Sequence, residues 1–331
     1  MNLPPPPAIP PPPADGRPRP FWSVMIPTYR PKEKFLRQTL ESVLQQAPGP
    51  DEMQIEVVDD CSPDADVAAL VRAIAGDRVN FSRTPENLGL AGGWNTCIAR
   101  ARGEWVHILH QDDRVLPGFY AALRRATEAH PTAALVASRA RYVDAQGVVK
   151  KISPRVAALE RGEPAVEEFF YFLTPIECAG VAVRRKFYEE HGGFRTDLKF
   201  MLDAEMWMRA FGAAGGVVIP EALADWRISD GQSTDRMQRS GETLRDFERG
   251  SEIMAARYPT FDSRRARMLI RNKALDQVVH FTRKGDFAAA RASWNHLQTD
   301  LSGAQRCRAL ARRLMVWTAW WLLKKFDERQ P

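Results

Sequence analysis

The sequence predicts an α/β fold in which a mostly parallel, Rossmann-like sheet is flanked by helices. Short apolar runs typical of buried strands alternate with segments of helical periodicity, three times within about 80 residues. Acidic residues follow two of these apolar runs at the point where each strand is expected to end. From residue 236 onwards the patterns are helical alone, which predicts a C-terminal helical extension.

We expect three parts: an extended, disordered arm over residues 1–20, an α/β domain over 21–235 and the helical extension over 236–331. Ten of the first 20 residues are proline, so this segment has no apolar periodicity. It lacks the apolar core of a signal peptide. No stretch approaches the roughly 20 apolar residues that a membrane-spanning helix needs.

The composition, 44% hydrophobic and 27% charged among 331 residues, is that of a soluble globular protein. Lys and Arg exceed Asp and Glu by 47 to 41, a balance that suits phosphates or an anionic membrane surface. No basic stripe interleaved with aromatic residues precedes residue 230, which argues against nucleic-acid binding. The four cysteines are far apart in the sequence, which argues against a zinc site or a disulfide framework and favours a reducing cytoplasm.

In the first half of the domain, strand and helix alternate. Residues 21–26 form an apolar run that ends at a proline-containing loop, and residues 33–46 carry one apolar stripe of helical spacing. Apolar runs at 55–58 and 79–82 predict the second and third strands, with a helix over 67–74 between them. This alternation predicts a parallel sheet with helices on both faces.

A fourth strand, over 105–109, is central to the prediction because it ends in two adjacent carboxylates, Asp112 and Asp113. A glycine-containing loop at 85–95 precedes it and opens a helix. Its glycines permit close approach of the backbone to a ligand, and free N–H groups at the helix start suit an anion. The loop matches neither G-x-G-x-x-G nor a Walker loop. Pro117 then starts a further helix.

After a fifth strand at 134–138 the alternation loosens. Residues 141–165 predict an antiparallel excursion, and residues 175–184 predict a loop and a strand. A helix follows over 201–209, where Asp203 has the position of an N-cap in front of an apolar stripe. Two short strands, at 217–219 and 223–228, and a polar loop at 229–234 complete the domain.

The C-terminal extension carries helical patterns over 243–258, 264–283, 287–297 and 304–326. In the last of these, three tryptophans lie in an apolar run between basic flanks. Such a segment suits the headgroup boundary of an anionic membrane. The alternative is a helix that packs on the domain or on a second subunit. We therefore expect residues 306–325 to contact a membrane surface or, in a homo-oligomer, another copy of the chain.

Ligands of open α/β sheets bind beyond the carboxyl ends of the strands. Asp59, Asp60, Asp112, Asp113 and Asp203 therefore point to one site. A pyrophosphate-linked donor needs a cation to neutralise the leaving diphosphate, and a neighbouring carboxylate can take the proton from an attacking hydroxyl. The plainer alternatives are that Asp112 and Asp203 cap helices and that Asp113 is solvated.

Over residues 22–234, these motifs resemble the inverting family 2 glycosyltransferases of GT-A fold. The resemblance rests on segments 24–30, 57–62, 87–95, 109–113, 178–180, 202–209 and 226–233, which occur in the family's order. It implies an enzyme that transfers a sugar from a nucleotide-diphosphate sugar to an acceptor hydroxyl. Assembly of a cell-surface polysaccharide or glycolipid is the expected setting.

The resemblance also implies roles for single residues. Asp203 is the expected catalytic base, and Asp113 is the expected ligand of Mg²⁺ or Mn²⁺. Glu205 corresponds to the family's second acid, and Arg227 to an arginine that contacts phosphates. The other residues expected to bind the donor are Pro27, Thr28, Tyr29, Arg30, Asp59, Asp60, Asn87, Gly89, Gly92, Asp112, Gly180 and Trp207.

Three positions depart from the family's pattern. Leu202 replaces the acid that usually precedes the base, Ser229 replaces a histidine near the metal, and His110 stands where the D-x-D element often begins with Asp. Asp113 is then the one strong protein ligand, and diphosphate oxygens and water complete the metal shell. We therefore expect weak metal affinity without nucleotide.

The expected partners are a nucleotide-diphosphate sugar donor and a saccharide or lipid-linked acceptor, with no nucleic acid. The expected location is the cytoplasm, with peripheral attachment to the cytoplasmic face of the inner membrane. Two further functions stay open. The glycines at 89–93 would also cradle phosphates in a nucleotidyltransferase or a dinucleotide-binding enzyme, and the substitutions at 202 and 229 favour a non-catalytic carbohydrate-binding or scaffold protein of the same fold.

Overall fold

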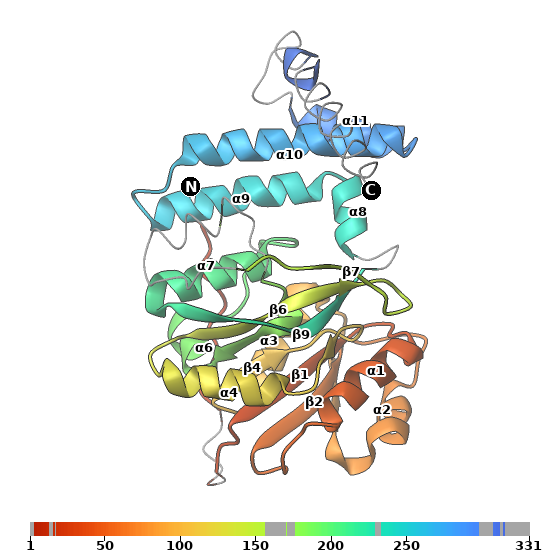
Figure 1. Ribbon diagram of the computed structural model, residues 1–331, viewed down its shortest axis with the longest axis vertical. Helices are drawn as coiled ribbons and strands as arrows, with labels where there is room; N and C mark the ends of the chain where they lie inside the picture. Colours follow the sequence, from red (N-terminus) through yellow and green to blue (C-terminus); the bar gives the residue numbers. More distant parts are fainter. Residues whose placement is uncertain are drawn as a thin grey trace, which may run out of the picture. The chain divides into compact units, whose positions relative to one another are not determined.

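The computed structural model describes residues 3–12, 16, 18–155, 170, 176–228, 233–297, 307–311 and 314. The chain divides into two compact units, Met1–Ser229 and Asp230–Pro331, close to the boundary expected at residue 235. Unit 1 contains the sheet, and unit 2 contains helices only among its described residues (Figure 1).

The strands of unit 1 are β1 (Trp22–Thr28), β2 (Met53–Asp59), β3 (Asn80–Arg83), β4 (Trp105–Ile108), β5 (Arg114–Val115), β6 (Leu135–Val143), β7 (Val149–Ile152), β8 (Val181–Arg184) and β9 (Gly216–Arg227). They pair in the order β3-β2-β1-β4-β8-β6-β9-β5, with β7 beside β6. Most paired positions are parallel. They belong to four pairs of strands: β1 with β2, β1 with β4, β2 with β3, and β6 with β9. The predicted α/β class with a mostly parallel sheet is confirmed.

Helices cover both faces of this sheet: α1 (Glu33–Leu44), α2 (Val67–Ala75), α3 (Gly89–Arg100), α4 (Phe119–Ala129), α6 (Arg185–His191) and α7 (Leu202–Ala214). Trp22, Val24 and Ile26 of β1 pack in one core cluster with α1, α2 and α4. Because side chains alternate along a strand, Met25 points to the other face, where α3 contacts β1.

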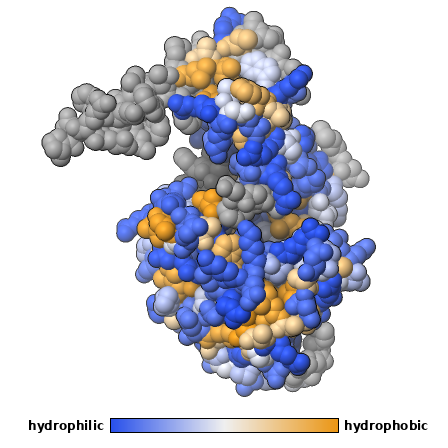
Figure 2. All heavy atoms as spheres, turned by 90° about the vertical axis from the view of Figure 1, so that its right-hand side faces the viewer, coloured by the Kyte–Doolittle hydropathy of each residue, from blue (hydrophilic) through white to orange (hydrophobic). Residues whose placement is uncertain are grey.

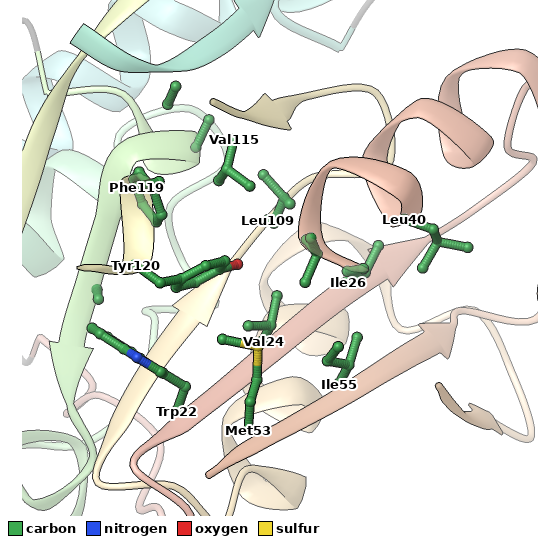
Figure 3. Close-up of a cluster of buried hydrophobic side chains, with 14 of the residues drawn as sticks. Trp22, Val24, Ile26, Leu40, Met53, Ile55, Leu109, Val115, Phe119 and Tyr120 are labelled. Carbon is green, nitrogen blue, oxygen red and sulfur yellow. The ribbon is translucent and has the colours of Figure 1, made fainter. Parts of the chain in front are cut away.

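The main core lies between the sheet and α1, α2 and α4. Figure 3 shows Val24 and Ile55, from neighbouring strands, on the same side of the sheet as Leu40 of α1. All three are fully buried, which contributes roughly 1.5–3 kcal/mol for each side chain. The apolar stripe predicted at 33–46 is therefore the buried side of α1. On the face shown in Figure 2, hydrophilic and hydrophobic side chains are interspersed.

Several predicted element boundaries are wrong. The loop expected over 85–95 ends early, because α3 begins at Gly89 and contains Gly92. Helix α4 begins at Phe119, not at Pro117. The two short strands expected at 217–228 are one strand, β9, whose ladder with β6 shifts register near Ser138. Such a shift disturbs the alternation along the strand, so one strand reads as two in the sequence.

Residues 3–12 contradict the expectation of a disordered arm. Ile9 is 5% exposed, and the Pro7 carbonyl accepts a hydrogen bond from the Gly193 N–H at 2.8 Å. The buried Arg185 guanidinium donates to the Pro10 carbonyl, also at 2.8 Å. Proline restricts the unfolded chain, so this segment loses little conformational entropy when it docks. Composition alone therefore did not reveal its packing.

Unit 2 contains α8 (Ser233–Arg239), α9 (Glu242–Arg257), α10 (Ser263–Arg283) and α11 (Phe287–His296). These helices confirm the patterns predicted over 243–297, and Asp262 and Asp286 cap the starts of α10 and α11. Most of the helix predicted over 304–326 lies outside the described residues. Within the described part of the chain, every helix is too short or too polar to cross a membrane.

Candidate functional site

The loops that leave β1, β2 and β4 are joined to one another by hydrogen bonds. Gln111 accepts a hydrogen bond from the Tyr29 N–H at 2.9 Å and donates one to the Tyr29 carbonyl at 3.1 Å. The Arg30 N–H donates to the Ser62 hydroxyl at 2.8 Å. Arg30 and Cys61 have φ values of 47° and 56°, which side chains seldom adopt. Tertiary contacts thus hold a strained set of loops at this edge of the sheet.

Pro27 and Thr28, expected to face a nucleotide, form the end of β1. Pro27 pairs in register with Val58 of β2, and the Thr28 hydroxyl donates to the Val58 carbonyl at 3.3 Å. Thr28 is buried. The structure therefore places these two residues in the sheet that carries the loops, and their contact with a donor stays a prediction.

Asp59, at the end of β2, is fully buried, and its carboxylate is held by the loop after β2 and by β3. Its carboxylate accepts hydrogen bonds from the Ser62 N–H at 3.1 Å and from the Ser62 hydroxyl at 2.5 Å. The Arg83 guanidinium lies 3.4 Å from it. These contacts hold the loop after β2 in shape.

Asp60 binds the start of α3. Its carboxylate accepts hydrogen bonds from the N–H groups of Leu88 at 2.8 Å and Gly89 at 2.9 Å, and its carbonyl accepts one from the Asn87 amide at 3.0 Å. Gly89 has a φ of 70°, which favours glycine at this position. Two of the N–H groups at the start of α3, where an anionic ligand was expected, are therefore occupied by the protein's own carboxylate.

Asp113 is in a different situation. It is 1% exposed, and its Oδ1 accepts a hydrogen bond from the Arg227 N–H at 2.8 Å. Its Oδ2 is buried, forms no hydrogen bond with the described residues, and lies 3.4 Å from His110 Nδ1. Burial raises the pKa of Asp113 to about 6, partly offset by the contact with His110. This carboxylate keeps one oxygen available for a ligand.

His110 lies between Asp113 and an aromatic ring. Its imidazole stacks on Trp94 with the ring centroids 4.8 Å apart. Burial lowers the pKa of His110, but the neighbouring Cys178 and Asp113 side chains raise it more, and the net shift is upward. The imidazolium would place a positive charge beside the Asp113 carboxylate, where the family's pattern often has another acid.

Asp203 is the second residue of α7, and Met201 holds the N-cap position, so the predicted N-cap role is wrong. Its Oδ1 accepts a hydrogen bond from the Ala204 N–H at 2.7 Å, and burial raises its pKa. Its charge acts on Glu177 and Cys178, as does that of Asp113. The structure therefore brings Asp113 and Asp203, 90 positions apart, around the same groups.

Glu177 belongs to this cluster, although the sequence reasoning missed it. Tyr142 donates a hydrogen bond to its Oε1. Burial, together with the charges of Asp203 and Asp113, raises the pKa of Glu177 to about 7 against the opposing effect of Tyr142. The available signal was an acid directly before the predicted donor-binding turn at 178–180.

That turn is held tightly against the sheet. A Cβ on Gly180 would lie 2.7 Å from the Ser138 carbonyl oxygen, so only glycine fits. His107 Nε2 lies 3.0 Å from the Ala179 carbonyl. Burial lowers the pKa of His107 to about 3, so its neutral imidazole donates this hydrogen bond. The glycine that was expected to bind the donor thus also sets the position of the turn.

Glu205 and Trp207, both predicted to bind the donor, are buried in the protein. Glu205 forms an ion pair with Arg209 at 2.9 Å, and Arg209 donates to the Gly193 carbonyl at 2.8 Å. Trp207 is 2% exposed and packs edge-on against Phe194. These contacts fix α7, which carries Asp203, and a direct contact with the donor stays a prediction.

Arg227 likewise has a buried guanidinium, with 1% of the residue exposed. It donates to the Asp112 carbonyl at 2.8 Å and to the Gln38 side chain at 2.9 Å. It also lies 4.3 Å from the centre of the Phe35 ring. Together with the hydrogen bond from its N–H to Asp113, these contacts hold the 112–113 loop. To bind a phosphate, the guanidinium would have to break some of these contacts.

Asp113 is the residue of this site that fits a divalent cation. Among the described residues, no group of three or more His, Cys, Asp and Glu side chains has a metal-binding arrangement. The buried Oδ2 of Asp113, which has no hydrogen-bond partner among the described residues and lies beside His110, fits a single hard oxygen ligand of Mg²⁺ or Mn²⁺, which keep water and substrate oxygens in their shells.

Comparison with curated proteins finds relatives over part of the chain. An uncharacterized protein of Mycobacterium tuberculosis is 28% identical over 241 residues, which cover 70% of this chain and 74% of that protein. The succinoglycan biosynthesis protein ExoO of Rhizobium meliloti is 45% identical over 65 residues, 20% of this chain and 18% of ExoO.

Solved structures share the fold. TarS residues 1–349 of S. aureus, in complex with UDP-GlcNAc, matches with a TM-score of 0.55 and 17% identity, over 85% of this chain and 93% of that one. The mannosyltransferase PcManGT of Pyrobaculum calidifontis, in complex with GDP-Man and Mn²⁺, matches with a TM-score of 0.55 and 19% identity. The match covers 97% of this chain and 85% of that one.

The family assignment rests on the sequence itself. The model of glycosyl transferase family 2 matches residues 23–192, just over half of the chain. This segment contains five of the seven segments that carried the resemblance, whereas 202–209 and 226–233 lie beyond it. The chain therefore belongs to glycosyl transferase family 2.

Proposed function

We propose that this protein is an inverting, metal-dependent glycosyltransferase that moves a sugar from a nucleotide-diphosphate sugar to an acceptor hydroxyl. The observation that carries the proposal is the cluster of Asp113 and Asp203, whose charges act on the same groups, Glu177 and Cys178. Family membership supports glycosyl transfer, and the complexes of TarS with UDP-GlcNAc and of PcManGT with GDP-Man support a nucleotide-sugar donor.

Asp203 acts as the base in this proposal. Its carboxylate takes the proton from the acceptor hydroxyl as the oxygen forms a bond to the anomeric carbon, and the bond from that carbon to the diphosphate breaks. The raised pKa of Asp203 makes it a better proton acceptor than an ordinary aspartate. One base on the face opposite the leaving group implies inversion, as in inverting glycosidases.

Asp113 holds the cation in this proposal. A bound Mg²⁺ or Mn²⁺ would neutralise the negative charge of the departing diphosphate. The Arg227 N–H fixes Oδ1 of Asp113, so that Oδ2 faces a ligand in a constant orientation. The Mn²⁺ in the PcManGT complex supports this choice of metal.

A screen with UDP-, dTDP- and GDP-sugars, with and without Mn²⁺, tests the proposed function. Calorimetry would report binding, and release of the nucleoside diphosphate would report turnover. We expect one donor to bind in a metal-dependent way and to turn over. Binding without turnover would support a scaffold or carbohydrate-binding role instead. Binding of NAD would support a dinucleotide-binding enzyme, and turnover of a nucleoside triphosphate would support a nucleotidyltransferase.

The cellular setting is a further part of the proposal. The match to ExoO, a succinoglycan biosynthesis protein, supports a role in cell-surface polysaccharide assembly. We also propose that residues 306–325 attach the protein to the cytoplasmic face of the membrane, because tryptophans there lie between basic flanks. Truncation after Ser302 should abolish co-sedimentation with anionic vesicles, and unchanged sedimentation would contradict the attachment. The homo-oligomer stays a prediction.

A further inference from the structure

Glu177 is held firmly at the site although the mechanism above does not use it. Its carbonyl closes the turn at 178–180 by accepting the N–H of the turn's last residue at 2.9 Å. Tyr142 donates to its Oε1, and the Tyr142 ring is fixed by Trp226, at 5.0 Å between ring centroids, and by Lys151 Nζ at 4.0 Å. The carboxyl group therefore has a defined position and a supporting donor.

One oxygen of this carboxyl group remains for a ligand. Among the residues that the structure describes, none forms a hydrogen bond with Oε2 of Glu177, and the side chain is only partly buried. Tyr142 occupies Oε1 alone.

The charges around Glu177 restrict what that ligand is. The carboxylates of Asp113 and Asp203 both act on it and help to raise its pKa. A third carboxyl group in this space would repel a diphosphate. A neutral hydroxyl can donate to its carbonyl-type oxygen whether or not the carboxyl group is ionised, so a hydroxyl fits where an anion does not.

In the proposed mechanism, the donor sugar lies between the diphosphate near Asp113 and the base Asp203. We infer that Glu177 recognises this sugar, by accepting a hydrogen bond from one of its ring hydroxyls at Oε2, and that Tyr142 positions the carboxyl group for this contact. The inference rests on the proposed function, and it makes Glu177 a determinant of sugar specificity.

Calorimetry on the full chain tests this assignment through the difference between a sugar nucleotide and its sugar-free counterpart. The probes are the UDP-, dTDP- or GDP-sugar that the wild type binds and UDP, dTDP or GDP itself. We expect Glu177→Ala to lower the affinity for the sugar nucleotide about 10-fold and to change the affinity for the nucleoside diphosphate less than about 2-fold. Glu177→Gln, which keeps the shape of the side chain and an acceptor oxygen, should lower the affinity for the sugar nucleotide about 5-fold, and Tyr142→Phe should lower it about 3-fold.

Glu221→Gln is the matched control, because it removes a carboxylate from an exposed position of the same unit and should change neither affinity. The assignment would be overturned if the Glu177 variants lost as much affinity for the nucleoside diphosphate as for the sugar nucleotide. It would also be overturned if both variants kept the wild-type affinity for the sugar nucleotide. If the wild type binds no sugar nucleotide, the proposed function itself fails. If instead the wild type and the Glu177 variants bind the sugar nucleotide equally well, only the role of Glu177 fails.

Discussion

Two groups of acidic residues at the same edge of the sheet differ in the number of hydrogen bonds that their carboxylates accept. Asp59 and Asp60, after β2, accept hydrogen bonds from the main-chain and side-chain groups around them. Asp113, Glu177 and Asp203, near the end of β4, have fewer donors and raised pKa values. The contacts of the first group stabilise loops, whereas the second group supplies the residues of the proposed mechanism and of the inferred sugar contact.

The difference has an energetic meaning. A buried carboxylate without enough donors destabilises the folded state, because its desolvation is not compensated. Proteins keep such groups where function requires them. The contrast between the two groups therefore predicts opposite outcomes on mutation: loss of stability after β2, and loss of activity with retained stability near β4.

The largest effect is expected for Asp203→Asn. Removal of a general base lowers turnover by about 10²–10⁴-fold. Donor binding and the melting temperature should stay near wild type, since the Asn oxygen can still accept the Ala204 N–H. Nucleoside diphosphate release measures the loss, and turnover within about 3-fold of wild type would contradict the assigned role.

Asp60→Ala is expected to act on stability. It leaves the Leu88 and Gly89 N–H groups without their acceptor, at a cost of about 2 kcal/mol in the free energy of unfolding. Chemical denaturation followed by a probe in unit 1 measures this. Asp64→Ala is the control, because Asp64 is exposed and makes one surface ion pair. Unchanged stability with lost donor binding would support the donor-binding prediction for Asp60 and contradict the structural role.

Asp113→Asn should remove metal-dependent donor binding without destabilising the fold. Asn keeps an oxygen for the Arg227 N–H and removes the buried charge. Because the folded-state pKa of about 6 is above the ordinary value, the ionised group is unfavourable at pH 7, and we expect a gain on the order of 1 kcal/mol. Calorimetry with and without Mn²⁺ and denaturation in EDTA measure the two effects. A clear loss of stability would show that Asp113 belongs with the first group.

The last prediction concerns pH. The pKa of Glu177 is about 7 in the folded state and ordinarily 4.5, so between these values the folded protein binds a proton that the unfolded chain has released. Wild-type stability should therefore fall relative to Glu177→Gln as the pH rises from about 4.5 to 7, and the difference should then level off. Melting temperatures in EDTA across this range measure it. A difference that does not depend on pH would mean that the pKa of Glu177 is the same in the folded and unfolded states.

The sequence by itself determined the α/β class, most of the strands and helices, and the acids expected at the strand ends. These features are local, since apolar periodicity distinguishes strand from helix within a few residues. The motifs also identified the family correctly. The helical patterns over 243–297 were predicted for the same reason.

Tertiary structure alone decided which acids are paired and which remain available. Asp60 receives the Leu88 N–H from 28 positions away, and Asp113 receives the Arg227 N–H from 114 positions away. The docking of residues 3–12 and the position of Glu177 depend on similarly distant contacts. No local pattern encodes such partners, because a hydrogen bond depends on where the folded chain places two groups and not on the residues beside each of them.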